Sequence, residues 1–209
     1  MFTGIVQAIG TVHSTLKTDY GLRIAINPGD WDHQPKLGDS IAHNGCCLTL
    51  VAIEDASDGS PLWIYDAIPE TIMKTTIGTW TKGQRINLER SLRMGDGLDG
   101  HQVQGHIDGV GTILSVSTAD EYRVRIGLAE FNMKWMIPKG SIAIDGVSLT
   151  IADLNPDEQW IEVTLIPETL DRTNLKDRSG ADGVNIEADA TVKTIVHTIE
   201  QMHANHQIG

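Results

Sequence analysis

The sequence has few basic residues and no long apolar run. It contains 16 Lys and Arg against 28 Asp and Glu, a formal net charge of −12. This charge argues against a nucleic-acid ligand, because a phosphate backbone is bound by a basic surface. No apolar run approaches the roughly 20 residues that span a bilayer, and the N-terminus lacks the basic and apolar regions of a signal peptide. We therefore expect a soluble, cytoplasmic protein that binds neither nucleic acid nor membrane.

Cysteine is also scarce, since the chain has only the adjacent Cys46 and Cys47. Neighbours on a strand point to opposite faces, so a disulfide between them is not expected. The absence of a CxxC pair and of a second cysteine cluster excludes a thiolate zinc site. His203 and His206 lie close together near the C-terminus but have no further ligating partners in the sequence. We interpret them as a solvated helix end and expect no metal.

What the sequence does contain is an internal repeat. Four blocks recur in the same order: Gly4–Val12 with Gly105–Ile113, Ser40–Thr49 with Ser141–Thr150, Ile68–Thr71 with Ile166–Thr169, and Asn87–Glu89 with Asn185–Glu187. The first two pairs share one spacing, and the last two share a slightly shorter one. The chain is therefore a duplicated domain, and each copy is too long for a solenoid unit but near the usual size of a domain.

The repeat divides the 209 residues into two domains and a tail. We expect the first domain at residues 1–97 and the second at residues 98–190, because the glycine-rich stretch Met94–Gly100 is typical of a flexible joint. Residues 191–209 have no counterpart in the first copy. Their apolar positions have the spacing of an amphipathic helix and are Val192, Ile195, Val196, Ile199 and Met202. This helix could pack on its own domain or join subunits, and we favour an oligomerisation helix because nothing in the repeat requires it.

Each copy consists of short β-rich segments separated by glycine. The expected strands are Ile5–Val12, Ser40–Ala52, Ile64–Ile68 and Arg85–Glu89, then Ile107–Val116, Tyr122–Leu128, Ser141–Ala152, Trp160–Ile166 and Gly183–Glu187. Asn44-Gly45 and Asp145-Gly146 are signals for tight turns between strands. Short helices are expected at Glu70–Ile77, after Pro167 and around Ala129–Met136. This pattern predicts a small closed or sandwiched antiparallel β-structure in each half.

Three positions that differ between the copies carry chemically active side chains. The corresponding pairs are Ile5 and His106, Cys47 and Ser148, and Ser91 and Asp189. If the copies pair, one pocket could hold a histidine, a hydroxyl, a carboxylate and a thiol, and histidine can move protons near neutral pH. The same four residues also have structural interpretations, as a hydrogen-bonding histidine, a strand hydroxyl, a solvated turn and a core thiol. On their own they predict a duplicated β-domain with a small-molecule pocket.

Six segments make the chain resemble the riboflavin synthase family. They are Met1–Gln7, His43–Thr49, Gly105–Ile107, Lys139-Gly140, Ile144–Thr150 and Leu165–Leu170. All match that family in order and spacing, and the resemblance runs from Met1 to about Asp189. It implies an all-β chain of tandem duplicated six-stranded antiparallel Greek-key barrels with a C-terminal α-helix, assembled as a homotrimer.

The resemblance also implies a reaction without a cofactor. Two molecules of 6,7-dimethyl-8-ribityllumazine react by four-carbon transfer and give riboflavin and 5-amino-6-(D-ribitylamino)uracil. In this family the productive site lies between the first barrel of one subunit and the second barrel of a neighbour. Holding two reactants in register removes much of the entropic cost of a bimolecular reaction. Association with a lumazine synthase is left open.

The site residues that the resemblance implies come from three matching segments in each copy. The catalytic group is His106, Ser148, Asp189 and Cys47. The lumazine-binding residues of the first copy are Phe2, Gly4, Ile5, Val6, Cys47, Leu48, Thr49, Asp66, Ala67, Ile68, Pro69, Glu70 and Thr71. Those of the second are Gly105, His106, Ile107, Lys139, Ser148, Leu149, Thr150, Thr164, Leu165, Ile166, Pro167, Glu168 and Thr169. Phe2 resembles an aromatic lid on the first barrel, and Lys139 is expected to reach a neighbouring subunit.

Two other functions compete with the enzyme. A non-catalytic antenna protein of the lumazine-protein type would bind the same chromophore, but such relatives depart from the Cys-Leu-Thr and Gly-His-Ile motifs that this chain keeps at Cys47–Thr49 and Gly105–Ile107. A flavin-binding reductase barrel would need a partner nucleotide domain, and no G-x-G-x-x-G follows a strand here. The sequence favours the enzyme.

Overall fold

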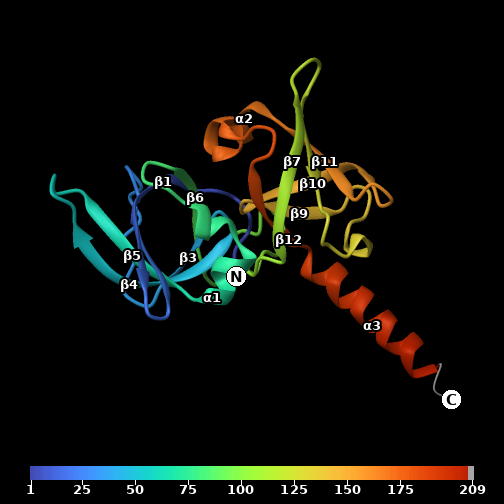
Figure 1. Cartoon of the computed structure of the whole chain (residues 1–209), viewed down its shortest axis with the longest axis horizontal. Helices are drawn as coiled ribbons and strands as arrows, with labels where there is room; N and C mark the ends of the chain where they lie inside the picture. Colours follow the sequence, from blue (N-terminus) through green and yellow to red (C-terminus); the bar gives the residue numbers. More distant parts are fainter. Residues whose placement is uncertain (207–209) are drawn as a thin grey trace.

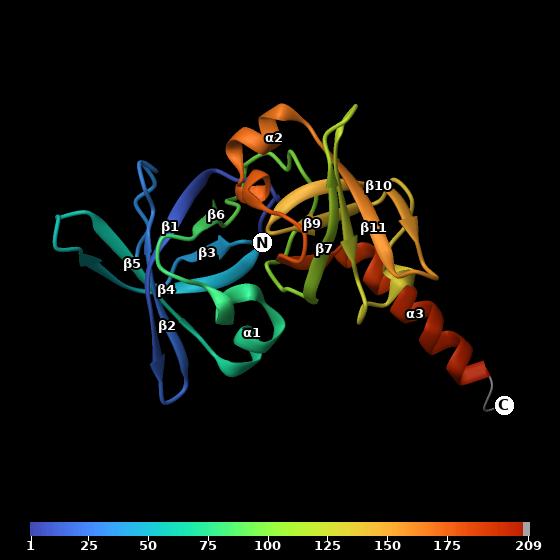
Figure 2. The ribbon, with the colours of Figure 1, turned by 45° about the horizontal axis from the view of Figure 1, so that its top comes forward.

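The computed structural model describes residues 1–206, which form two closed six-stranded antiparallel barrels and a long C-terminal helix (Figure 1). The fold class expected from the repeat and the resemblance is confirmed. The barrels lie side by side, and the N-terminus lies at the seam between them (Figure 2).

The two barrels have the same circular strand order. Barrel one contains β1 (Ala8–Thr18), β2 (Gly21–Asn27), β3 (Ser40–His43), β4 (Cys46–Asp55), β5 (Pro61–Ala67) and β6 (Arg85–Arg90), closed in the order β1-β2-β5-β4-β3-β6. Barrel two contains β7 (Gly109–Ser117), β8 (Tyr122–Gly127), β9 (Ser141–Ile144), β10 (Val147–Asn155), β11 (Trp160–Leu165) and β12 (Gly183–Ala188), closed in the order β10-β11-β8-β7-β12-β9. Each strand of one barrel therefore has a counterpart in the other.

One strand was missed by the sequence analysis. β2 was not expected, although its counterpart β8 was, and the alternation of Leu22, Ile24 and Ile26 with less apolar neighbours is the ordinary strand signal. Ile24 and Ile26 are fully buried in the core of barrel one. Comparison with Tyr122–Leu128 in the second copy would have revealed β2.

Irregularities in the ladders fall at the same places in both barrels. The register shifts between Val12 and Ser14 in β1 and between Ile113 and Ser115 in β7. β4 and β10 carry matching shifts after Leu50 and Ile151. An extra residue bends a strand and increases its twist, so these positions help the sheets to close.

The two predicted tight turns meet at the seam. Asn44 and Asp145 both have φ 45°, followed by Gly45 at φ 80° and Gly146 at φ 76°, as two-residue hairpins require. A Cβ atom on Gly45 would lie 2.7 Å from the nitrogen of Gly146. Glycine is needed here twice over, for its backbone conformation and because the barrels touch.

Two buried asparagines bind the barrels together by reciprocal hydrogen bonds. Asn87 Nδ2 donates to Asp145 O at 2.9 Å, and Asn185 Nδ2 donates to Asn44 O at 2.9 Å. Their Oδ1 atoms accept, at 2.8 Å each, from the backbone nitrogens of Asn174 and Thr76. Each asparagine thus satisfies a turn and a helical turn of the opposite barrel, which fixes the two barrels relative to each other.

The repeat also extends to the short helices. α1 (Pro69–Lys74) and α2 (Pro167–Arg172) lie on opposite sides of the seam (Figure 2). The helix expected at Glu70–Ile77 stops at Lys74 because Thr75 is extended, and its Oγ1 accepts from Ile77 N to start a 3₁₀ turn. The stretch Ala129–Met136 contains only a 3₁₀ turn, Met133–Trp135.

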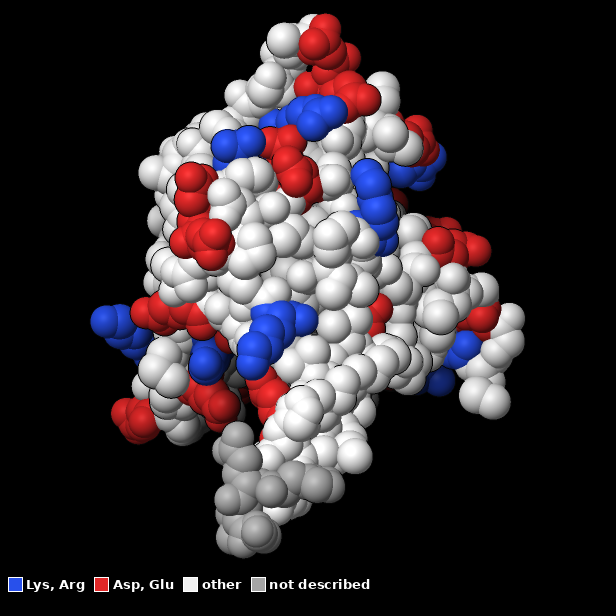
Figure 3. Space-filling view, turned by 90° about the vertical axis from the view of Figure 1, so that its right-hand side faces the viewer, with Lys and Arg blue, Asp and Glu red and all other residues white. Residues whose placement is uncertain are grey.

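The C-terminal helix α3 (Ala190–His206) projects away from barrel two (Figure 1). Ile195 and Ile199 are 54% and 48% exposed, and a largely uncharged surface runs down to the end of the helix (Figure 3). Of the expected helix, residues 207–209 lie outside the described part of the chain. No helix among residues 1–206 is both long and apolar enough to cross a membrane.

Candidate functional site

Strand pairing brings two of the three expected segments of each copy together. Leu50 of β4 pairs with Tyr65 of β5, which sets Thr49 and Asp66 at the same end of this strand pair. In barrel two, Ile151 pairs with Val163, which places Thr150 and Thr164 in the same relation. Beyond β5 and β11 the chain turns outward into α1 and α2, and Ile68 and Ile166 are exposed in both copies. The second and third segments thus present matching surfaces on the two barrels.

The first segment of each copy is exchanged across the seam. Ser148 N donates to Gly4 O at 2.7 Å, and Cys47 N donates to Gly105 O at 2.9 Å. Val6 accordingly packs against the core of barrel two, and Ile107 against the core of barrel one. Gly4–Val6 therefore adjoins the Ser148 segment, and Gly105–Ile107 adjoins the Cys47 segment, a pairing that the sequence analysis did not foresee.

Two buried carboxylates hold these exchanged segments in place. Glu187 accepts hydrogen bonds from the backbone nitrogens of Gln104, Gly105 and His106 at 2.7, 2.9 and 3.1 Å. In the first copy Glu89 accepts from Thr3 N at 2.6 Å and Thr3 Oγ1 at 2.8 Å, and also from Gly4 N. Burial raises the pKa of both carboxyls, and the backbone donors oppose that rise. The sequence flagged both glutamates only as parts of repeat blocks.

Ser148 contacts a histidine that the sequence analysis missed. His101 Nδ1 lies 2.7 Å from Ser148 Oγ. Burial lowers the pKa of His101, and the charge of Asp189 opposes this. Gly100 is required beside it, since a Cβ there would lie 2.1 Å from Thr3 O and 3.0 Å from Ser148 Cβ. The structure thus brings Ser148, His101 and Asp189 into one cluster.

The other catalytic candidates have different surroundings. His106 is exposed, and its imidazole makes no hydrogen bond within the described part of the chain. Asp189 Oδ1 accepts from Thr191 N at 2.7 Å and Val192 N at 3.3 Å, so its carboxylate caps α3. Asp189 therefore has a structural role in addition to its place near His101.

The two cysteines face opposite sides of β4, as expected for neighbours on a strand, and both are free. Cys46 lies in the core of barrel one, where burial raises the pKa of its thiol to about 12. Cys47 is half-buried and packs on the cluster formed by Phe2, Ala42, Val103 and Ala143. Phe2 is fully buried and pairs with Val103 across the seam. The expectation of a Phe2 lid is corrected, because its ring fills the joint between barrels.

Three further candidates are engaged within their own barrels. Arg23 binds Asp66 through two hydrogen bonds of 2.8 Å, and these lower the pKa of the Asp66 carboxyl. Lys139 Nζ lies 3.5 Å from Ala152 O. Glu168 pairs with Arg172 on the exposed side of α2.

The remaining candidates differ in burial. Ala67, Leu48 and Leu165 are buried; Thr49, Thr150, Ile5, Pro69, Glu70 and Pro167 are exposed; Leu149, Thr71, Thr164 and Thr169 are intermediate. No group of three or more potential metal ligands gathers within residues 1–206.

A known domain family matches both halves of the chain. The lumazine binding domain matches residues 3–91 and again residues 104–189. These two ranges contain all twelve strands of the barrels. They also contain both sets of three segments described above, with the exception of Phe2.

Whole-chain relatives include several riboflavin synthases. The riboflavin synthase of Brucella abortus is 37% identical over 190 residues, which is 90% of this chain and 93% of that protein. That of Bacillus amyloliquefaciens is 35% identical over 214 residues, covering 100% of this chain and 95% of that protein.

Solved structures agree at the level of the fold. LumP in complex with riboflavin superposes with a TM-score of 0.79 at 28% identity, covering 90% of this chain and 99% of that chain. LumP in complex with 6,7-dimethyl-8-(1′-D-ribityl) lumazine gives a TM-score of 0.77 at 26% identity, with the same coverage. Taken with the duplicated barrels and their matching segments, these similarities show that the chain belongs to the riboflavin synthase family of two-copy lumazine-binding proteins.

Proposed function

We propose that the protein is a riboflavin synthase that converts two molecules of 6,7-dimethyl-8-ribityllumazine into riboflavin and 5-amino-6-(D-ribitylamino)uracil by four-carbon transfer, with no cofactor. The observation that carries this proposal is the presence of the same segments at the same strand positions in both barrels. Two equivalent binding surfaces suit a reaction between two identical substrates. The riboflavin synthases that match over nearly the whole chain support it.

The second copy supplies the groups suited to proton transfer in this proposal. The imidazole of His106 is exposed beside the Cys47 segment of barrel one, and Ser148 with His101 and Asp189 forms a polar cluster on barrel two. At the corresponding place beside the Ser148 segment of barrel two stands Ile5, which has no titratable group. The proton-handling groups of copy two are thus divided between the two lumazine-binding surfaces.

We further propose that the productive site forms between chains of a homotrimer. The exposed Ile195 and Ile199 on α3 suit an intersubunit contact, because an apolar helix face is stabilised by covering it. Mixing two inactive variants tests this. Thr49→Trp blocks the barrel-one surface and Thr150→Trp blocks the barrel-two surface, and mixed trimers should regain part of the activity because some interfaces then pair two intact halves. Mixed trimers verified by mass that stay inactive would place each site within one chain.

The competing function is that of a lumazine-binding antenna, which we consider because the fold is similar to that of LumP. Purified full-length protein incubated with the ribityllumazine alone distinguishes the two. The enzyme should produce riboflavin and the aminouracil in equal amounts, measured by chromatography, and a chelator should not slow it. Tight binding of the lumazine without product would establish the antenna instead.

A further inference from the structure

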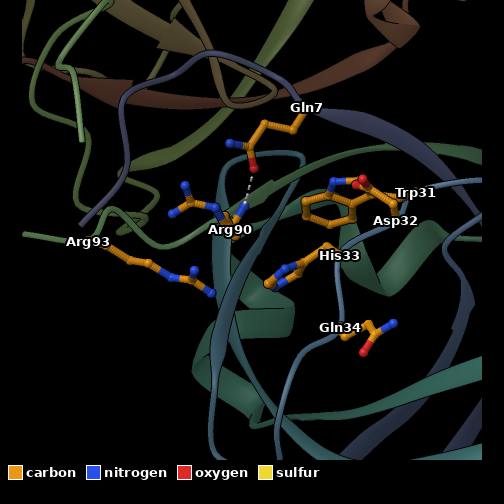
Figure 4. A pocket seen from close by; sticks show the side chains of 7 residues that line it. All are labelled: Gln7, Trp31, Asp32, His33, Gln34, Arg90 and Arg93. Atoms are coloured by element: carbon orange, nitrogen blue, oxygen red, sulfur yellow. Dashed lines mark hydrogen bonds between the residues drawn. The ribbon is translucent and has the colours of Figure 1, made fainter. Parts of the chain in front are cut away.

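A cavity on barrel one lies outside the candidate lumazine-binding residues. Its volume is about 510 Å³, within the range of small-molecule sites. The loop residues 31–34, between β2 and β3, form one side, and Gln7, Arg90 and Arg93 form the other (Figure 4). None of these residues is among the candidate lumazine-binding residues, although Gln7 directly follows Val6.

Two guanidinium groups and an imidazole converge on this cavity. Arg90 is fixed by its backbone nitrogen, which donates to Gln7 Oε1 at 3.0 Å, and by Nη1, which donates to Asp96 Oδ2 at 2.8 Å. The remaining nitrogens of the Arg90 fork are not engaged by described residues. The Arg93 side chain reaches toward His33 (Figure 4) and has no ion pair or hydrogen bond among residues 1–206. The cavity therefore holds donors that no group of the described chain satisfies.

The pKa of His33 is influenced by the same two arginines. Burial lowers the pKa of His33, and the charges of Arg93 and Arg90 lower it further, while Asp39 and Asp32 oppose them. In a chain with a net charge of −12, two arginines line this cavity with a single lining carboxylate, Asp32, while Asp96 pairs with Arg90. Arginine forks match the oxygens of a phosphate in a bidentate manner.

Aromatic rings line the cavity beside these cations. The rings of Trp31 and His33 have centroids 4.9 Å apart, and Trp31 lies 5.6 Å from the ring of Trp63. Trp63 is buried in the core of barrel one, so it holds Trp31 in place from behind. Trp31 is half-buried and lines the cavity. A flat indole face of this kind stacks on a planar heteroaromatic ring.

We infer that this cavity binds a phosphate monoester of a planar heteroaromatic compound, with the ring against Trp31 and the phosphate between Arg90 and Arg93. The site is separate from the lumazine-binding surfaces, and the inference does not rest on the proposed function. The uncharged base or the phosphate alone satisfies only half of the cavity, so the joined molecule should bind more tightly than either.

Adenosine 5′-monophosphate serves as the probe, with adenosine and inorganic phosphate as its two halves, each titrated into the full-length protein by calorimetry. We expect the monophosphate to bind at least roughly tenfold more tightly than either half, and Arg93→Gln to weaken it roughly tenfold, as loss of a charge-assisted hydrogen bond does. Lys82→Gln removes an exposed cation beyond the opposite end of β6 and should leave the affinity unchanged. The indole N–H signal of Trp31 should shift on binding.

Three results would overturn the inference. The first is no binding of the monophosphate at millimolar concentration, and the second is binding that Arg93→Gln leaves intact. The third is an affinity of adenosine or of inorganic phosphate alone that equals that of the monophosphate. None of these results bears on whether the protein makes riboflavin, so the two proposals fail separately.

Discussion

The two barrels have the same strand order, but their hairpin turns make the contact at the seam with different side chains. In barrel one, the neutral Asn44 accepts from Asn87 N at 2.8 Å and Asn174 Nδ2 at 3.0 Å. In barrel two, Asp145 stands at the same place, accepts from Asn185 N at 2.9 Å and pairs with Arg178 at 2.5 Å. Both hairpin turns provide an acceptor oxygen at this position, and only the turn of barrel two adds a negative charge.

The barrel cores also differ, and here barrel one has the more polar side chains. Barrel one encloses His43 and Tyr65, whose rings lie 4.2 Å apart edge to face. Barrel two has Ile144 and Val163 at the corresponding positions, both buried. Barrel one therefore carries an ionisable side chain in its core, and barrel two carries its charge at the seam. Four predictions test what the differences between the two barrels contribute.

The largest effect should come from breaking the buried ion pair of barrel two. Arg178→Met leaves the fully buried Asp145 without its cation and should lower the free energy of unfolding by about 3–5 kcal/mol. Adding Asp145→Asn, the side chain that barrel one uses, should recover at least half of the loss. Arg172→Met, which removes an exposed arginine from α2, is the control for urea unfolding. Equal costs for Arg178→Met and Arg172→Met would show that the pair adds nothing.

The next effect concerns the division of labour in catalysis. His106→Gln should lower the turnover number by roughly a hundredfold, the lower end of what general acid–base groups contribute. Asp189→Asn should also lower turnover while keeping the side-chain oxygen that caps α3. His13→Gln changes a histidine of barrel one outside the candidate segments and is the control. Steady-state rates that remain within threefold of the parent for His106→Gln would rule out a proton-transfer role.

A pH dependence should distinguish the two cores. Burial lowers the pKa of His43 from 6.5 to about 3, so the unfolded chain takes up this proton below pH 6.5 and the folded chain does not. The stability from His43 is thus lost as the pH falls from 6.5 toward 3, about 2 kcal/mol of it between pH 7 and pH 5. His43→Ile, which copies Ile144 of barrel two, should remove this part of the pH dependence. Urea midpoints at pH 7 and pH 5 that change equally in parent and variant would contradict it.

The smallest effect concerns α3, the element that barrel one lacks. Lys134 binds Glu200 of the helix at 2.7 Å, but both side chains are exposed. Lys134→Ala should therefore change the free energy of unfolding by no more than about 0.5 kcal/mol. A loss above 1 kcal/mol in urea unfolding would mean that α3 is held by its own barrel rather than by a contact with another chain.

Features encoded locally were predictable from the sequence. The repeat blocks marked the equivalent strands, and the dipeptides Asn44-Gly45 and Asp145-Gly146 marked both hairpins, because a turn with positive φ needs those residue types. The closed barrel itself came from the resemblance, since strand patterns alone do not distinguish a barrel from a sandwich.

Features that depend on contacts between the copies were not predictable. The exchange of Gly4–Val6 and Gly105–Ile107 arises from the packing of the barrels, which no local pattern encodes. His101 has no counterpart in the first copy, because Met1 corresponds to Gln102, so differences between the copies do not single it out. Phe2 was assigned by resemblance to a lid, whereas its burial depends on Val103 of the other copy.

The exchanged first segments have a consequence for how such a chain can arise and be divided. Each barrel is completed by a short arm from the other, as in a domain-swapped dimer whose two subunits have been fused. A break in the stretch Met94–Gly100 would therefore produce two fragments that each lack part of their own packing and regain it by reassociating. The fusion converts that bimolecular encounter into an intramolecular one, so that neither half has to find its partner in solution.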